Sequence, residues 1–324
     1  MSDIVYNFVI PNDLKHSHDD WEPSHKDFHI FNDGRYAWVL LTYYLMKKTG
    51  LKARISSSLS FEQINLTHVR TVSEMKVVPP CFLITCLADW TTRVPFRHLD
   101  VVQNQLQAGP SAVWIPHWPQ AGLLPRAHDR AEVRRAGFLG RVDNETEFKR
   151  IGERLRVNGI DFIVRGEETW NNFSDLDLSL SLRFMAPYRI RRKPPTKLIN
   201  AWLAGVPFVA LDEPAFEQIG CNGQDYLGVR TPEEVVEAII ALRENPELYR
   251  MLVENGRKKA VEYDWKATTQ RWTELLEGPL RERYELWKRR PLFEAVRFRL
   301  LHAAWMFWKR SIKVFAHHVH HTRA

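Results

Sequence analysis

One stretch, residues 193–211 (KPPTKLINAWLAGVPFVAL), limits what this chain can fold into more than any other. Two adjacent prolines cannot continue a helix from upstream, but they suit the first turn of a new one. Apolar residues then recur at helical spacing, and Gly205 and Pro207 end the helix before a short apolar run, Phe208–Leu211. This order predicts a helix that packs on a sheet and is followed by a buried parallel strand.

The start of this predicted helix carries positive charge. Lys193, Thr196 and Lys197 surround first-turn amides that have no partner within the helix, and the helix dipole adds a partial positive charge. We therefore expect a diphosphate to bind there. The alternative is an ordinary capped helix whose lysines are only solvated.

Composition sets the wider limits. The 324 residues are 44% hydrophobic and include 12 tryptophans, which predicts two globular domains of ordinary size. The three cysteines (Cys81, Cys86 and Cys221) have no metal-ligand spacing, and no secretory signal is evident, so we expect a cytoplasmic protein. No apolar run reaches the roughly 18 residues of a membrane span.

Strand and helix patterns alternate in each half of the chain, which predicts an α/β fold with parallel sheets. Each half has its own set of expected elements, and a rigid proline-rich segment at 116–125 is typical of a crossing between domains. We therefore predict an N-terminal domain at 1–121, a C-terminal domain at 122–278 and a tail at 279–324. The main expected elements are strands Ile4–Ile10, Lys52–Ser56, Val77–Leu87, Ala112–Ile115, Gly137–Leu139, Ile160–Val164 and Leu176–Leu182, and helices Tyr36–Lys48, Asn144–Asn158, Pro232–Arg243, Pro246–Tyr263 and Trp265–Leu276.

Two segments raise the question of a metal site. Residues 11–29 are rich in His and Asp, but no histidine pair has i, i+4 spacing within a helical pattern. Asp175-Leu176-Asp177 has the D-x-D form of some metal-dependent transferases, but it alternates with leucines as a strand with one polar face does. We expect no metal.

Several motifs in the second half, taken in order, resemble a known family. Trp114–His117 falls where that family has an "IPNG" turn, Gly137–Arg141 is similar to its "FVGR" strand and loop, and Ser174–Ser181 resembles its "ADVFVLPS" strand. Asn200–Pro207 is similar to its "EALAxGxP" helix, and Gly223–Glu234 follows as the family's usual ending does. The family is the retaining family-four glycosyltransferases, so residues 112–276 resemble the carboxyl-terminal half of a GT-B enzyme.

The resemblance implies two Rossmann-like domains that face each other across a cleft. It also implies a nucleotide-diphosphate-sugar donor in place of a bound cofactor. The family carries two glutamates as E-x7-E, and the corresponding positions here are Arg192 and Asn200. Both carboxylates are thus absent, and Arg192, Lys193 and Lys197 put positive charge where the family has negative charge. This leaves the sugar, the ribose contact and the stereochemical course open but favours contact with phosphate.

From the residues and the resemblance together, we predict a metal-independent hexosyltransferase-type enzyme that moves a sugar to a lipid-linked saccharide or surface glycan. The expected donor contacts are Arg141, Lys193, Thr196, Lys197 and Asn200, with Glu213 and Glu217 as candidates for ribose or sugar contact or for a helix start. If the reaction inverts the anomeric centre, the first domain must supply a base, for which Asp33, Asp89 and His117 are the candidates.

Two other functions fit some of these features. A nucleic-acid-binding protein would use the basic aromatic tail, although no RNA-binding module signature is present and the two α/β halves would have no purpose. An epimerase or phosphorylase on the same fold would also bind a nucleotide or a sugar.

The tail contains most of the excess positive charge. Residues 279–324 carry eleven Lys/Arg and three Asp/Glu, a local charge of +8 within a whole-chain charge of +7. Its apolar residues form one helical stripe: Phe293, Val296, Leu300, Ala304, Phe307, Trp308, Ile312 and Phe315. Such a helix (residues 291–316) can lie on an anionic membrane at the inner face, or it can pack on the first domain.

Overall fold

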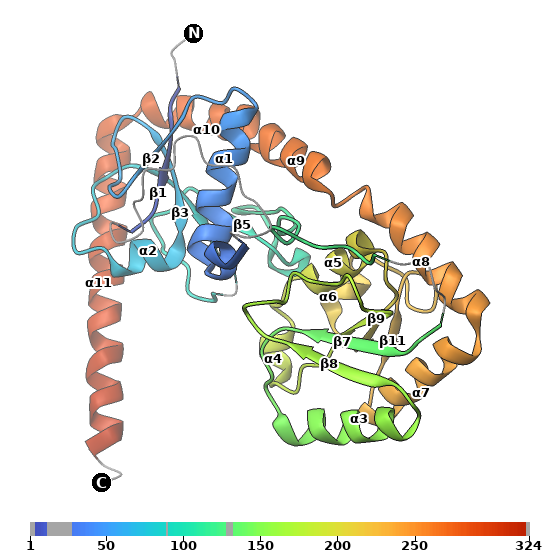
Figure 1. Ribbon diagram of the computed structural model, residues 1–324. Coiled ribbons are helices and arrows are strands. Elements are labelled where there is room, and N and C mark those ends of the chain that lie inside the picture. The colour runs from blue at the N-terminus through green and yellow to red at the C-terminus, as the bar shows by residue number, and fades with distance from the viewer. Residues whose placement is uncertain (1–3, 12–27, 89, 128–131, 322–324) are drawn as a thin grey trace.

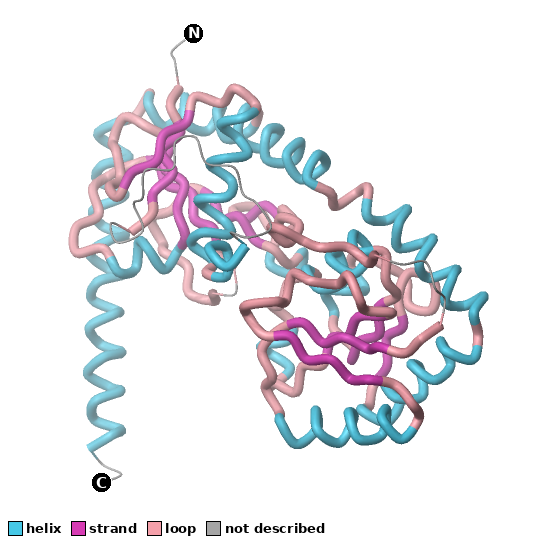
Figure 2. The backbone as a smooth tube through the Cα atoms, viewed as in Figure 1, coloured by secondary structure: helices cyan, strands magenta, loops and turns pink. Residues whose placement is uncertain are grey.

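The structure, a computed structural model, describes residues 4–11, 28–88, 90–127 and 132–321, and of residues 310 and 312–321 it describes the backbone alone (Figure 1). Two separate parallel sheets are visible, each surrounded by helices (Figure 2). The predicted α/β class with two Rossmann-like domains and a helical C-terminal region is confirmed.

The first domain contains a six-stranded parallel sheet in the order β2-β1-β3-β4-β5-β6. Strands β3 and β4 are buried throughout, as expected for a parallel sheet covered on both faces. The strands are β1 (Tyr6–Val9), β2 (Ala53–Ser56), β3 (Ile64–His68), β4 (Phe82–Cys86), β5 (Leu99–Val102) and β6 (Ala112–Trp114). The helical elements are η2 (Phe28–Asn32), η3 (Tyr36–Leu40), α1 (Leu41–Lys48), α2 (Val69–Glu74) and η4 (Gln105–Gln107).

The second domain contains a five-stranded parallel sheet in the order β11-β10-β9-β7-β8. Its strands are β7 (Arg135–Leu139), β8 (Asp161–Arg165), β9 (Leu178–Ser181), β10 (Phe208–Leu211) and β11 (Leu227–Val229). Its helices are α3 (Glu145–Val157), α4 (Pro187–Ile190), α5 (Thr196–Ala204), α6 (Pro214–Glu217), α7 (Pro232–Glu244) and α8 (Pro246–Ala260).

Residues 193–211, with the two prolines, the helix and the apolar strand, fold as predicted. Helix α5 begins after the two prolines and ends at Gly205, whose φ of 71° is the left-handed conformation that favours glycine. Strand β10 follows and is fully buried. The apolar face of α5 packs under the second sheet through Leu198, Ile199 and Trp202.

The last elements return to the first domain (Figure 1). Helices α9 (Trp265–Glu277) and α10 (Pro279–Lys288) place Trp272, Leu276 and Tyr284 in the core of the first domain. The Tyr6 hydroxyl donates a hydrogen bond to the Leu276 carbonyl oxygen at 2.5 Å. The predicted C-terminal domain ends at residue 278, but α9 within it packs with the first core, so the change of core falls before α9.

A tryptophan stack holds the crossing between the domains. The Trp118 ring stacks on Trp265 with the centroids 5.9 Å apart and on Trp272 at 6.4 Å. Its indole nitrogen donates to the Thr42 hydroxyl at 2.8 Å. The first crossing segment and the returning α9 are therefore tied to the same helix of the first domain.

The sequence analysis did not predict β3, β5, α2 or β11. In β3 the polar residues Asn65 and Thr67 interrupt the apolar pattern, yet both are completely buried. Thr67 donates to the Val9 carbonyl oxygen at 2.7 Å, and Asn65 donates to the Phe82 carbonyl oxygen at 3.1 Å. Hydrogen bonds to neighbouring strands thus satisfy polar groups that the apolar pattern would place in solvent.

Helix α11 (Pro291–His321) runs along the first domain and extends past it (Figure 1). It packs through Phe298 and Trp305, both buried against Phe96. Neither residue belongs to the apolar stripe predicted from the sequence. Within the described ranges, every helix is too short or too polar to cross a membrane.

Candidate active site

A cavity of about 500 Å³, here named the second-domain cavity, lies at the carboxyl end of β7 and the start of α5. All five predicted donor contacts line it: Arg141, Lys193, Thr196, Lys197 and Asn200. Asn32 and Gln120 also contribute to its lining, so the first domain and the crossing segment both reach it. Ligands of open α/β sheets bind at this kind of edge.

The first turn of α5 leaves donors unpaired at the cavity. The first backbone hydrogen bond of the helix runs from the Ile199 amide to the Pro195 carbonyl oxygen at 3.1 Å. The Thr196 hydroxyl is buried, and no described residue offers it a hydrogen bond. Free amides, a hydroxyl and the positive end of the dipole at one place make an anion site.

Lys197 supplies a cation on the same turn. Its ammonium lies 3.7 Å from the centroid of the Phe138 ring, and no described carboxylate forms an ion pair with it. Burial and the positive charge of Arg183 lower the pKa of Lys197 well below its usual value, although Glu213 and Asp143 oppose the shift. A bound anion would relieve this electrostatic cost.

Gly140 allows the lysine to lie so close to β7. Its φ is 153°, and a Cβ at this position would meet the Lys197 ammonium at 2.9 Å. The backbone conformation therefore favours glycine at the turn after β7, and a Cβ there would displace the Lys197 ammonium.

The two predicted glutamates are placed differently from the lysines. Glu213 is only 1% exposed; it forms an ion pair with Arg183 and accepts a hydrogen bond from the Ser181 hydroxyl at 2.9 Å. Arg183 lines the cavity, so Glu213 positions a cation rather than facing the cavity itself. Glu217 is exposed on α6 and does not contribute to the cavity lining.

The remaining predicted contacts have partners of their own. Arg141 forms an ion pair with Glu167 and is largely exposed. Asn200 accepts a hydrogen bond from the Gln120 amide at 3.1 Å, which joins α5 to the crossing segment. Asn104, which follows β5 in the first domain, donates to the Lys193 carbonyl oxygen at 2.8 Å. The two domains therefore already contact each other through the site.

A second cavity of about 420 Å³, here named the first-domain cavity, adjoins the first and shares Asn32, Gln120, Arg141, Trp170 and Thr196 with it. Two of the three predicted base candidates, Asp33 and His117, line this cavity. Asp89 lies outside the described residues. The base candidates and the donor contacts thus meet at one two-part cleft between the domains.

Asp33 is tied to Arg35. One oxygen of its carboxylate accepts from the Arg35 amide at 2.8 Å, and the other pairs with the guanidinium at 2.8 Å. Burial would raise the pKa of Asp33, but the hydrogen bonds and charge of Arg35 outweigh it and hold the pKa below its usual value. A carboxylate with a lowered pKa is a weak base.

His117 has the geometry that a base requires. Its Nδ1 lies 2.6 Å from the Trp118 carbonyl oxygen, which can only accept, so Nδ1 carries the hydrogen. In the neutral ring the lone pair then lies on Nε2. The Trp38 ring, at 5.2 Å and nearly perpendicular, supports the orientation of the imidazole.

The sequence analysis missed His68, which lines the same cavity at the carboxyl end of β3. Its Nδ1 accepts from the Arg70 amide at 3.1 Å, so the neutral ring carries its hydrogen on Nε2, where it can donate to a ligand. The signal available in the sequence was a histidine ending an apolar strand. Next to it lies Ala88, whose φ of 47° is strained for a residue other than glycine, as happens at functional sites.

Neither aspartate of the D-x-D segment is available to a metal. Asp177 accepts from the Arg134 and Arg135 amides at 2.8 and 2.7 Å, and Asp175 pairs with Arg135 and Arg165. Over the described ranges, no three His, Cys, Asp or Glu side chains gather as metal ligands.

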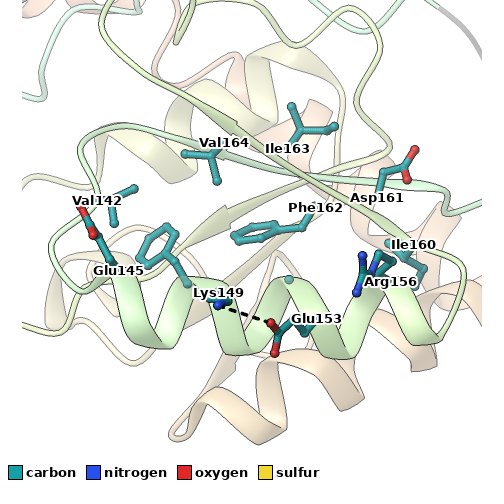
Figure 3. Close-up of a pocket in the computed structure, with 12 residues that line it drawn as sticks. Val142, Glu145, Lys149, Glu153, Arg156, Ile160, Asp161, Phe162, Ile163 and Val164 are labelled. Atoms are coloured by element: carbon teal, nitrogen blue, oxygen red, sulfur yellow. Dashed lines mark ion pairs between the residues drawn. The ribbon is translucent and has the colours of Figure 1, made fainter.

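A further cavity lies elsewhere in the second domain. A groove of about 610 Å³ runs between α3 and the edge strand β8, on the side of the second domain away from the first (Figures 1 and 3). Phe148 and Phe162 line it. Lys149 and Glu153, on α3, form an ion pair at 4.0 Å (Figure 3). It contains none of the predicted site residues, so the cleft between the domains remains the candidate active site.

Solved structures with this architecture identify the fold class as GT-B. AviGT4, a glycosyltransferase involved in avilamycin A biosynthesis, has a TM-score of 0.56 at 13% identity, over 86% of this chain and 98% of that one. The Anabaena protein HepE, in complex with UDP-glucose, has a TM-score of 0.51 at 11% identity, over 85% and 99%. TarM has a TM-score of 0.50 at 12% identity over 73% of this chain, which spans 57% of the TarM chain.

The family follows from the second half of the chain. A family model described as glycosyl transferase-like matches residues 112–277, about half of the sequence, and the chain belongs to this family. The chain thus has a GT-B fold and belongs to a glycosyl transferase-like family, as the sequence motifs implied. No curated protein matches the sequence.

Proposed function

We propose that this enzyme transfers a sugar from a nucleotide diphosphate sugar to a hydroxyl of a glycan acceptor, with the diphosphate bound at the start of α5. The observation that carries the proposal is the unpaired Thr196 hydroxyl beside the Lys197 ammonium, at a helix start that opens into the cleft. HepE, which shares the fold, has been solved with UDP-glucose, and this supports the donor class.

In the proposed reaction the bond between the anomeric carbon and the diphosphate oxygen breaks, and the diphosphate leaves with the electron pair. Thr196, Lys197 and the first amides of α5 stabilise the charge that develops on the leaving oxygen. The acceptor hydroxyl oxygen bonds to the anomeric carbon. In an inverting course its proton passes to His117 Nε2, while Nδ1 stays bonded to the Trp118 carbonyl.

Turnover should not require a divalent metal, because helix amides and cations can neutralise the diphosphate. We expect activity to survive EDTA. Loss of turnover with the chelator and its return with manganese would contradict this, and would require Asp175 and Asp177 to release their arginines.

The general test is release of nucleotide. The purified chain is screened by thermal shift against UDP-, GDP- and dTDP-sugars, where a hundredfold excess over the dissociation constant adds about 2.7 kcal/mol to the free energy of unfolding. The donor so found is then incubated with and without acceptor glycans. Release that depends on the acceptor supports transfer, whereas an altered sugar without release indicates an epimerase, and retention on nucleic acid without nucleotide-sugar binding indicates the alternative function.

We further propose that the acceptor is lipid-linked and that α11 rests on the anionic inner face of the membrane. The described part of the stripe predicted from the sequence stays exposed, since α11 packs through Phe298 and Trp305: Phe293 is 61%, Leu300 67% and Phe307 75% exposed. A helix with apolar side chains on two faces requires a second partner. The charge of +8 in the tail favours anionic lipid.

Flotation with vesicles tests this attachment. Vesicles of phosphatidylglycerol and phosphatidylcholine should carry the wild-type chain at low salt, and L300E or F307E should leave it in the soluble fraction. Truncation of the tail would not serve, because α10 contributes Leu280 and Tyr284 to the first core. The matched control is V157E, at an 85% exposed valine of α3 in the other domain. If wild type and L300E behave alike, the lipid-linked acceptor loses this support.

A further inference from the structure

A third pocket of about 380 Å³ lies beside the cleft, and neither the donor contacts nor the base candidates explain it. Among the described residues, six line this cationic pocket: Trp90, Thr91, Tyr188, Arg189, Arg192 and Lys193. It shares Arg189 and Lys193 with the second-domain cavity and Trp90 with the first-domain cavity. It therefore borders both parts of the cleft, where the remainder of an acceptor would extend from its reacting hydroxyl.

The two arginines of the pocket have no acidic partner among the described residues. Residues 187–193 (PYRIRRK) contain four cations and no acid, and no acidic side chain among the described residues lines the pocket. Neither Arg189 nor Arg192 forms an ion pair with a described carboxylate, whereas Arg183, Arg141 and Arg35 each have one. Guanidinium groups without partners, held next to each other, are suited to bidentate binding of a carboxylate or phosphate.

Two aromatic rings accompany the arginines, and they come from different domains. Trp90 follows β4 in the first domain and is 41% exposed, and Tyr188 in α4 of the second domain is 64% exposed. The Trp90 ring also contacts the ring of His68 edge-on, with the centroids 6.4 Å apart. Exposed aromatic faces beside a polar site provide an apolar surface for a ring-shaped ligand.

Arg192 separates this pocket from the donor site. It lines the cationic pocket and not the second-domain cavity, while Thr196 and Lys197 line the second-domain cavity and not the cationic pocket. The proposed function already assigns the start of α5 to the diphosphate of the donor. A second anion site outside it must therefore serve another charged group.

We infer that the cationic pocket binds an anionic group of the acceptor, a carboxylate or phosphate on a saccharide unit next to the one that is glycosylated. This assignment rests on the proposed function, because it identifies the ligand as the acceptor of the transfer. That the pocket binds a charged glycan is a separate claim. The charged group pairs with Arg189 and Arg192, and its sugar ring lies against Trp90 and Tyr188.

The test measures binding of the full chain to three sets of immobilised oligosaccharides by biolayer interferometry in 150 mM salt. One set is neutral hexose oligomers, one contains uronic acids, and one contains phosphodiesters. Wild type should be retained on a charged set and not on the neutral set, and the set that retains it identifies the anion.

Arg192→Gln should weaken retention on the charged set at least tenfold, and Tyr188→Ala should weaken it severalfold. The matched control is Arg191→Gln, since Arg191 is an exposed neighbour that does not line the pocket; it removes the same charge and should change retention less than twofold. Equal losses for Arg191→Gln and Arg192→Gln, equal retention on neutral glycans, or no retention at all would overturn the assignment.

Donor binding is measured separately, by calorimetry with UDP-glucose and GDP-mannose. Arg192→Gln should bind whichever donor wild type binds with an unchanged dissociation constant, and Lys197→Met should lose the donor while keeping the charged glycan. If wild type binds charged glycans through Arg192 but no nucleotide sugar, the proposed transfer fails while the anion site stands. If wild type binds a nucleotide sugar but no charged glycan through Arg192, the proposed transfer stands and the anion site fails.

Discussion

The two walls of the cleft are built in different ways. On the second-domain wall, Thr196, Lys197 and Gly140 lie on or beside regular elements, α5 and β7, whose backbone conformation and packing hold the side chains in place. On the first-domain wall, Asp33, Trp90 and His117 lie in connecting segments outside its regular strands and α-helices. Asp33 and His117 are each oriented by a residue close to them in the sequence, Arg35 and Trp118. A wall of regular elements suits a donor common to a family, whereas loops can vary with the acceptor. Substitutions on the two walls should therefore have separable effects.

The largest expected effect comes from the first-domain wall. If the reaction inverts, His117→Asn should lower kcat by about 10²–10⁴-fold, because the acceptor hydroxyl loses its base. The dissociation constant for the donor should change less than twofold. Steady-state kinetics and calorimetry on the same preparation check both values, with Asp33→Asn as the comparison. Retained turnover in His117→Asn would exclude the imidazole as the base.

The next effect is on stability and comes from beneath the second-domain wall. Glu213→Gln leaves the guanidinium of Arg183 without its buried carboxylate, which should lower the free energy of unfolding by about 3–5 kcal/mol. Urea denaturation measures it. Glu217→Gln, at an exposed position only four residues along the chain, should have almost no effect. Similar losses in the two variants would mean that the pair between Glu213 and Arg183 is not the cause.

Lys197 tests the second-domain wall directly. Lys197→Met should weaken donor binding by about 1.5–3 kcal/mol for each charge-assisted hydrogen bond lost, while the protein stays folded. Lys149→Met, at a lysine on the exposed side of α3, is the matched control. An unchanged donor affinity, measured by calorimetry, would remove Lys197 from the site.

The pH dependence is the smallest effect and has a defined sign. The pKa of Lys197 is lowered in the folded protein, so between that pKa and the usual value the unfolded chain binds more protons and the free energy of unfolding rises with pH. A bound diphosphate raises the pKa of Lys197 again. Donor binding in this window should therefore take up a proton and weaken as the pH rises.

Calorimetry in buffers of different ionisation enthalpy measures that uptake. Wild type should take up a fraction of a proton as the nucleotide sugar binds, and Lys197→Met should take up none. Equal uptake in both proteins would assign the proton to another group of the cleft.

Much of the second-domain wall could be predicted from the sequence because its determinants are local. Two prolines, an apolar repeat at helical spacing and Gly205 define α5 without reference to the rest of the chain. The positive charge beside that helix start is also a local property. The motifs after residue 112 implied the GT-B fold, and the family and fold comparisons confirm it.

Other parts of the site depended on contacts between segments that are distant in the sequence. His68 reaches the cavity because β3 lies at the centre of a sheet whose strand order does not follow the chain. Glu213 turns away from the cavity because Arg183, thirty residues earlier, meets it in the interior. Neither partner can be found from spacing within one element.

In the tail, too, some features follow from the local sequence and others from contacts with distant segments. The sequence by itself determined that residues 291–316 form a basic helix with a wide apolar stripe, because periodicity and charge are properties of the segment. Only the tertiary structure decided which face packs: the narrower face with Phe298 and Trp305 meets Phe96, and the wide stripe stays exposed as far as its side chains are described. The shape of the partner surface selects the face of a helix, and that surface is assembled from strands and loops far away in the chain.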